Sequence, residues 1–156
     1  MGVPWEAAAD AVGPTSRVVQ YTVAVDVRII ELDRKMDERG WFLKVLRRDQ
    51  LDAGRPFGEI YLSVCTPGHT RANHYHERTT EWFCAVEGRG IVTLVDIDSG
   101  DRREVPLDAE HPQTLVVPPR IAHAIRSTTD QPLVLLVYAD LPYDPEAPDA
   151  TPMAVA

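Results

Sequence analysis

Cysteine is scarce in this chain of 156 residues, which contains only Cys65 and Cys84. Two cysteines do not make a disulfide framework, so we expect reduced thiols and a cytoplasmic location. Long apolar runs are also missing. The longest clean one, Leu133–Ala139, is far shorter than the roughly 20 residues of a membrane helix. The chain does not begin with a basic segment followed by an apolar stretch, so no secretory signal is expected.

Basic residues are in the minority. Sixteen Lys and Arg face 24 Asp and Glu, which gives a formal net charge of −8. This balance argues against nucleic acid or an anionic membrane as the main partner, because both require a basic face. Hydrophobic residues make up 44% of the chain, enough for the core of one globular domain. The 13 prolines favour many short elements over long helices.

Short apolar or alternating segments, separated by turn residues, fill the middle of the chain. The sequence predicts strands over 25–32, 41–46, 57–65, 81–86, 88–97, 114–117, 122–127 and 133–139. Strands at this spacing predict an all-β fold, a sandwich or barrel with few short helices. We expect an N-terminal arm over 1–22, this β domain over 23–143, and an irregular, proline-rich C-terminal tail over 144–156.

Four side chains have the types and spacing of a metal site. His74 and His76 are two residues apart, so a strand would place both imidazoles on one face. A turn can bring Glu81 back beside them, and His123 begins a later strand after a pair of prolines. A single strand histidine is usually an ordinary surface residue, but this combination is hard to explain by accident. Three imidazoles and a carboxylate suit a borderline divalent metal such as zinc, iron, manganese or nickel.

The same residues resemble the two motifs of the cupin superfamily. Residues 68–88 match the first motif at each landmark, from the opening glycine through the histidines and glutamate to the closing glycine. Residues 118–123 resemble the second motif, with Arg120 where glycine is usual and Ser127 where asparagine is usual. The resemblance implies a jelly-roll β-barrel, a double-stranded β-helix, over 23–143.

Three short flanking segments resemble sequences of the sugar-nucleotide branch of the cupins. This branch includes the dTDP-4-dehydrorhamnose 3,5-epimerase family and the cupin domains of capsular-polysaccharide enzymes. The three segments lie at 37–42, at 71–76 and at 143–149. The resemblance implies an epimerase or isomerase that acts on a nucleotide-linked 4-keto-6-deoxy sugar in polysaccharide or glycosylated-metabolite biosynthesis. It also implies a homodimer formed through edge strands.

Roles for individual residues follow from the resemblance and from the chemistry of proton abstraction beside a ketone. His74 matches the family's base, and His76 accompanies it as a second catalytic imidazole. A tyrosine on a late strand is the family's acid; Tyr138 is the first candidate for it and Tyr143 the second. The expected substrate contacts are Arg71, Lys44, Arg39 and Tyr143.

Two alternatives stay open at this stage. A bound divalent metal, for which zinc is the first expectation, would occupy the lone pairs of His74 and His76 and leave the base to another group. Without metal, the histidines themselves would transfer protons. The function also has alternatives: a metal-dependent cupin dioxygenase of a small substrate, or a sugar- or metal-binding cupin without turnover.

Overall fold

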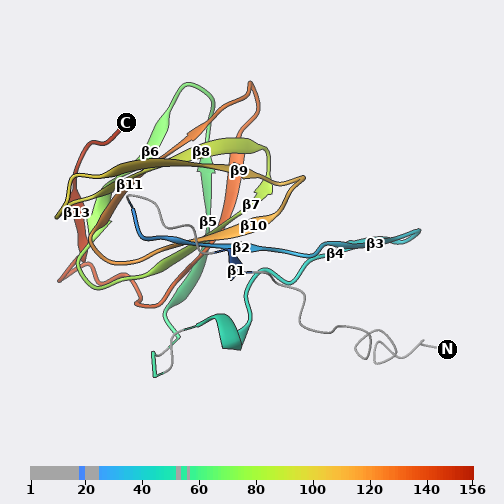
Figure 1. The fold of residues 1–156 in the computed structure, drawn as a ribbon, viewed down its shortest axis with the longest axis horizontal. Coiled ribbons are helices and arrows are strands. Elements are labelled where there is room, and N and C mark those ends of the chain that lie inside the picture. Colours follow the sequence, from blue (N-terminus) through green and yellow to red (C-terminus); the bar gives the residue numbers. More distant parts are fainter. Residues whose placement is uncertain (1–17, 20–24, 52–53, 56) are drawn as a thin grey trace.

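The computed structural model of the protein describes residues 18–19, 25–51, 54–55 and 57–156. Two antiparallel sheets face each other in this part of the chain (Figure 1). The six-stranded sheet has the order β1 (Val18–Val19), β2 (Arg28–Glu31), β10 (Gln113–Val117), β7 (Glu81–Glu87), β12 (Leu133–Ala139) and β5 (Glu59–Cys65). The five-stranded sheet has the order β13 (Ala150–Pro152), β6 (Thr70–His76), β11 (Ile121–Ser127), β8 (Arg89–Asp96) and β9 (Arg102–Asp108). This is a jelly roll, so the predicted fold class is confirmed.

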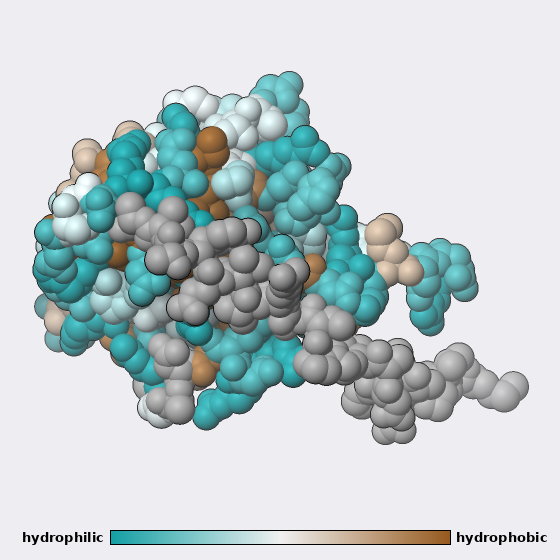
Figure 2. All heavy atoms as spheres, in the orientation of Figure 1, coloured by the Kyte–Doolittle hydropathy of each residue, from teal (hydrophilic) through white to brown (hydrophobic). Residues whose placement is uncertain are grey.

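Alternation along the strands divides the apolar residues between two clusters. The larger one fills the space between the sheets and includes Phe83, Leu94, Leu107, Leu115 and Val137. A smaller cluster, on the outer face of the six-stranded sheet, consists of Ile30, Trp82, Val116 and Tyr138. Neighbours such as Trp82 and Phe83 therefore point in opposite directions, as a strand requires. On the face drawn in Figure 2, hydrophilic side chains predominate around small, separate hydrophobic areas.

Strand β9 was not among the predicted strands. It contains Pro106, which lies opposite Ile91 of β8. Because β9 is at the edge of its sheet, a residue without an amide hydrogen is tolerated there. The predicted strand 41–46 is shorter than expected: only Gly40–Phe42 (β4) is extended, paired with Lys35–Asp37 (β3). This hairpin projects away from the barrel (Figure 1). A 3-10 turn, η2 (Arg48–Gln50), follows it.

The C-terminal residues are more regular than expected. The irregular tail predicted for 144–156 contains β13, which pairs with β6 at the edge of the five-stranded sheet. Beyond it, Asn73 of β6 accepts hydrogen bonds from the backbone N–H groups of Val155 and Ala156, at 2.9 and 3.2 Å. The free backbone groups of an edge strand explain why this segment is ordered. Most of the predicted N-terminal arm, residues 1–17 and 20–22, lies outside the described residues.

None of the helices in the described ranges is long and apolar enough to cross a membrane.

Candidate active site

The structure brings His74, His76, Glu81 and His123 together inside one end of the barrel. Their ligand atoms all lie within 4.8 Å of one another. Three features of the chain produce this arrangement. Alternation places both histidines of β6 on its inner face, and the antiparallel register sets His123 of β11 directly opposite His74. The turn after β6 then passes to the other sheet, where Glu81 is the first residue of β7.

The two oxygens of the Glu81 carboxylate have different surroundings. Oε1 accepts a 2.6 Å hydrogen bond from the hydroxyl of Tyr61. Oε2 lies 3.2 Å from Nε2 of His123 and 3.4 Å from Nε2 of His76, without hydrogen-bond geometry to either. Glu81 is only 3% exposed. A buried carboxylate oxygen and imidazole nitrogens without hydrogen-bond partners are the donor atoms that a divalent cation would satisfy, so this residue set fits a metal.

Burial and mutual charge shift the pKa values of the cluster. Burial, together with the neighbouring imidazoles of His123 and His76, lowers the pKa of His74 to about 4. Burial also opposes the charged form of His76, but the Glu81 carboxylate outweighs it and raises the pKa of His76. For Glu81, burial is likewise outweighed, because His123 and His76 hold the pKa of the carboxyl well below its usual range. At neutral pH the cluster therefore offers a neutral His74 beside an ionised Glu81.

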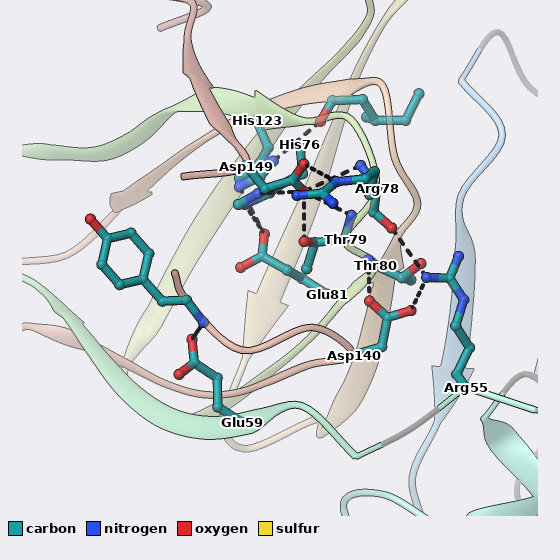
Figure 3. A network of polar contacts seen from close by, with 12 residues as sticks. Arg55, Glu59, His76, Arg78, Thr79, Thr80, Glu81, His123, Asp140 and Asp149 are labelled. Carbon is teal, nitrogen blue, oxygen red and sulfur yellow. Dashed lines mark hydrogen bonds and ion pairs between the residues drawn. The ribbon is translucent and has the colours of Figure 1, made fainter. Parts of the chain in front are cut away.

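Asp149 ties the C-terminal segment to the turn between β6 and β7 (Figure 3). Its Oδ2 accepts hydrogen bonds from the hydroxyl and the backbone N–H of Thr79, at 2.7 and 3.0 Å. Its Oδ1 accepts one from Nε of Arg78 at 3.2 Å. Oδ2 also lies 3.6 Å from Nδ1 of His76. In the sequence, Asp149 stood out only as part of the segment 143–149 that resembles the sugar-nucleotide cupins. The structure places it beside His76, a candidate metal ligand.

Asp140 supports the same turn from the opposite side and is 1% exposed. Its Oδ1 accepts a 2.8 Å hydrogen bond from the backbone N–H of Thr80, and its Oδ2 lies 3.3 Å from Nη1 of Arg55 (Figure 3). The turn that presents Glu81 is thus held by two carboxylates. No local pattern in the sequence points to Asp140, because its role depends on a contact between residues 60 positions apart.

A pocket of about 390 Å³ opens onto this cluster. Its lining includes His74, His76 and Tyr61 from the barrel, and Tyr143 and Asp149 from the C-terminal segment. This size is within the usual range for small-molecule sites. The segment expected to be a separate tail therefore forms one wall of the site.

Tyr138 does not reach this pocket. The alternation of β12 sends Val137 inward and Tyr138 to the outer face, where Tyr138 is 2% exposed. Its ring packs 5.1 Å from that of Trp82 and 5.5 Å from that of Phe57, measured between centroids. The structure therefore separates Tyr138 from the site to which the sequence assigned it as the catalytic acid. Tyr61 is the tyrosine that reaches the carboxylate. Its position on the inner face of β5 was discernible from alternation, but an inward tyrosine is more often a core residue.

The predicted cationic substrate contacts lie apart from the pocket. Arg39 is exposed in the turn of the β3–β4 hairpin, where it pairs with Asp37, and Lys44 is exposed just after the hairpin. Neither lines the pocket, because the hairpin points away from the barrel. Arg71 does not line it either, although its charge acts on Tyr61. Of the four predicted contacts, Tyr143 is the one in the lining, and Arg78 is a lining cation that the sequence analysis missed.

Comparison with known proteins places this site in a family. A model of the polysaccharide biosynthesis C-terminal domain matches residues 35–151. The chain belongs to this family. A similar protein, a probable low-salt glycan biosynthesis epimerase of Haloferax volcanii, is 30% identical over 130 residues, which cover 80% of this chain and 83% of that protein.

Solved structures agree with this family assignment. A dTDP sugar isomerase from Desulfovibrio desulfuricans superposes with a TM-score of 0.71 at 26% identity, covering 81% of this chain and 82% of that one. The capsular polysaccharide assembling protein CapF of Staphylococcus aureus shares the fold, with a TM-score of 0.62 and 22% identity over 80% of this chain. This chain spans only 34% of CapF. The resemblance to sugar-nucleotide cupins seen in the sequence is confirmed.

Proposed function

We propose that the protein is an epimerase or isomerase of a nucleotide-linked 4-keto-6-deoxy sugar in polysaccharide or glycosylated-metabolite biosynthesis. The observation that carries the proposal is a cluster of three histidines and one glutamate, of which His74, His76 and Glu81 line a pocket of small-molecule size. The similarity of 30% to a probable low-salt glycan biosynthesis epimerase supports the proposal, as does the match to the polysaccharide biosynthesis C-terminal domain. The match to a dTDP sugar isomerase supports the same substrate class.

The reaction requires a base, an acid and a stabilised enolate. A base removes the proton on the carbon next to the ketone, the C–H electron pair becomes the enolate, and an acid returns a proton on the opposite face. To remove this proton, the enzyme needs a base whose pKa lies close to the operating pH. It also needs a positive or hydrogen-bonding group at the enolate oxygen. The neutral imidazole of His74, which lines the pocket, has a free lone pair when no metal is bound.

We propose that His74, His76, Glu81 and His123 hold a divalent metal, for which zinc is the first candidate. These residues would hold the ion, which when bound would supply Lewis-acid chemistry for a ketone oxygen. In that state the histidines are ligands, and proton transfer falls to other groups of the pocket wall. Glu59 and Tyr61 are among the residues of the pocket wall with groups that can exchange a proton.

Isotope exchange tests the activity directly. The protein is incubated in deuterated water with dTDP- and UDP-linked 4-keto-6-deoxy sugars, and deuterium at C3 and C5 is followed by NMR. We expect incorporation by the wild type and none by His74→Ala. The control, His111→Ala, changes an exposed histidine outside the pocket and should exchange normally. Absence of exchange with every such sugar would sink the proposal.

The same assay distinguishes the two chemical routes. If exchange disappears with a chelator and returns with zinc, the metal is required. If exchange survives complete metal removal, the histidines perform the proton transfer.

Oxygen consumption with Fe(II) and a small substrate would instead identify a dioxygenase. Thermal stabilisation by a sugar nucleotide that stays unchanged would identify a binding protein without turnover.

We further propose that two copies pair through the β5 edge of the six-stranded sheet. Alternate side chains of this strand, Ile60, Leu62 and Val64, are 55%, 66% and 45% exposed. A row of exposed apolar side chains on an edge strand is a typical association surface. Light scattering should give a dimer for the wild type and a monomer for Leu62→Asp. A monomeric wild type would contradict this pairing.

A further inference from the structure

Tyr61 reaches Glu81 across an intervening strand. The two residues lie on β5 and β7, which are separated by β12 in the sheet. Tyr61 is level with the inward-facing Val137 of β12, so its ring also points into the barrel. The phenol is long enough to pass over β12 and donate to Oε1 of Glu81 at 2.6 Å. A phenylalanine could fill the same space but could not make this bond.

The bond makes the two carboxylate oxygens unequal. Oε1 receives the phenol hydrogen, whereas Oε2 faces Nε2 of His76 and Nε2 of His123 and has no hydrogen-bond partner. A phenol is protonated at neutral pH and a carboxylate can only accept, so the hydrogen of this bond belongs to Tyr61. A carboxylate in a buried site can otherwise offer one oxygen or both to a cation.

We infer that Tyr61 is a positioning residue that holds Glu81 so that Oε2 alone is offered to a divalent ion at the three histidines. The inference rests on the proposed metal. Its consequence is chemical. A carboxylate that binds through one oxygen uses one coordination position, and catalytic metal sites need a position that stays open for the substrate. Hydrogen bonds to metal-binding side chains typically change affinity by 10–100-fold.

Metal titration of Tyr61→Phe tests the role of the hydroxyl. Metal-free wild type and variant are titrated with zinc by calorimetry, and the absorption spectrum is recorded with Co(II). We expect affinity about 10-fold to 100-fold weaker in Tyr61→Phe, with altered Co(II) bands. The matched control is Tyr75→Phe. It removes the same hydroxyl from β6, between the two histidines but on the opposite face of the strand, and should leave affinity and spectrum unchanged.

A second measurement needs no change at Tyr61. Infrared difference spectra of the zinc-loaded and metal-free wild type are compared, with Glu81→Gln identifying the carboxylate bands. A wide separation of the antisymmetric and symmetric stretches supports binding through one oxygen, whereas a narrow separation overturns the inference.

The outcomes separate this inference from the proposed function. If the wild type binds neither zinc nor Co(II), the proposed metal site and the role of Tyr61 are both overturned. The proposed epimerase activity is tested independently by deuterium exchange. A wild type that binds metal, with Tyr61→Phe equal to it in affinity and spectrum, overturns the role of Tyr61 and leaves the metal in place. Equal losses in Tyr61→Phe and Tyr75→Phe also overturn it.

Discussion

The backbone N–H of Arg120 donates a 2.7 Å hydrogen bond to the carbonyl oxygen of His76. This bond joins the loop before β11 to the end of β6, the two strands that contribute the histidines. The side chain of Arg120 strengthens the junction through ion pairs with Glu77 and Asp98. Arg120 has a φ of +67°, the left-handed conformation in which glycine is usual. Arg120, which stands where the cupin motif usually has glycine, therefore keeps the left-handed backbone conformation. Its side chain also binds the two turns that contain Glu77 and Asp98.

Arg120→Gly and Arg120→Ala should differ in stability in a defined order. Both lose the ion pairs, but glycine removes the left-handed strain and alanine keeps it. We expect the melting temperature of Arg120→Ala to lie about 2–4 °C below that of Arg120→Gly. The difference between wild type and Arg120→Ala, which share the strain, should shrink in high salt, because exposed ion pairs are screened. An alanine variant as stable as the glycine variant would contradict the role of strain.

Tyr138→Phe should retain epimerase activity. The hydroxyl belongs to the outer cluster with Trp82 and Ile30, outside the pocket, so its removal affects packing and not proton transfer. Deuterium exchange should stay within about two-fold of wild type, with a lower unfolding midpoint in urea because a buried polar group is changed. Loss of exchange in a folded Tyr138→Phe protein would return this residue to the catalytic set.

The sequence predicted the parts of the site that depend on local spacing. His74 and His76 share a strand face because side chains alternate, and Glu81 follows after a short turn, so the sequence alone suffices to group them. His123 was found because a proline pair marks the start of its strand. The same alternation, with the correct phase, would have placed Tyr138 outside and Tyr61 inside. The family resemblance favoured Tyr138 because it lies on a late strand, whereas the phase of β12 points it away from the pocket.

Contacts between distant segments could not be predicted in this way. Asp149 and Asp140 support the β6–β7 turn from positions about 60–70 residues away in the chain. Their roles depend on how the C-terminal segment returns to β6, and prolines in that segment suggested irregularity. An edge strand with free backbone groups provided the pairing partner, and no local sequence signal encodes that.

Asp149→Ala should loosen the C-terminal wall of the pocket. The carboxylate accepts hydrogen bonds from Thr79 and Arg78, and its side chain is only 14% exposed. Loss of charged hydrogen bonds at such a site costs about 1–3 kcal/mol in the free energy of unfolding. Hydrogen exchange should speed up in residues 141–152, whereas the β8–β9 hairpin should keep its protection. If residues 141–152 exchanged at the same rate in wild type and Asp149→Ala, Asp149 would not anchor this segment.

Acid should destabilise the metal-free protein through His74. The pKa of His74 is about 4 in the folded protein, against an ordinary value of 6.5. Between these values the unfolded chain binds the proton and the folded protein does not, so stability falls as the pH is lowered from about 6.5 toward 4. Urea unfolding midpoints measured with a chelator across this range should show the decline, and His74→Asn should decline less.

His76 provides a control of opposite sign on the same strand. Its pKa is raised in the folded protein, so its contribution to stability is present below its ordinary pKa and is lost as the pH rises through the folded value. His76→Asn should therefore remove the gain in stability that the wild type shows as the pH falls toward 6.5 from above, and should leave the slope below pH 6.5 nearly unchanged, whereas His74→Asn makes the decline below pH 6.5 shallower. Adding zinc should counteract the decline near pH 6.5 in the wild type, because metal binding requires the neutral imidazoles. If both variants followed the wild-type curve, protonation of these two histidines would not be the cause of the acid sensitivity.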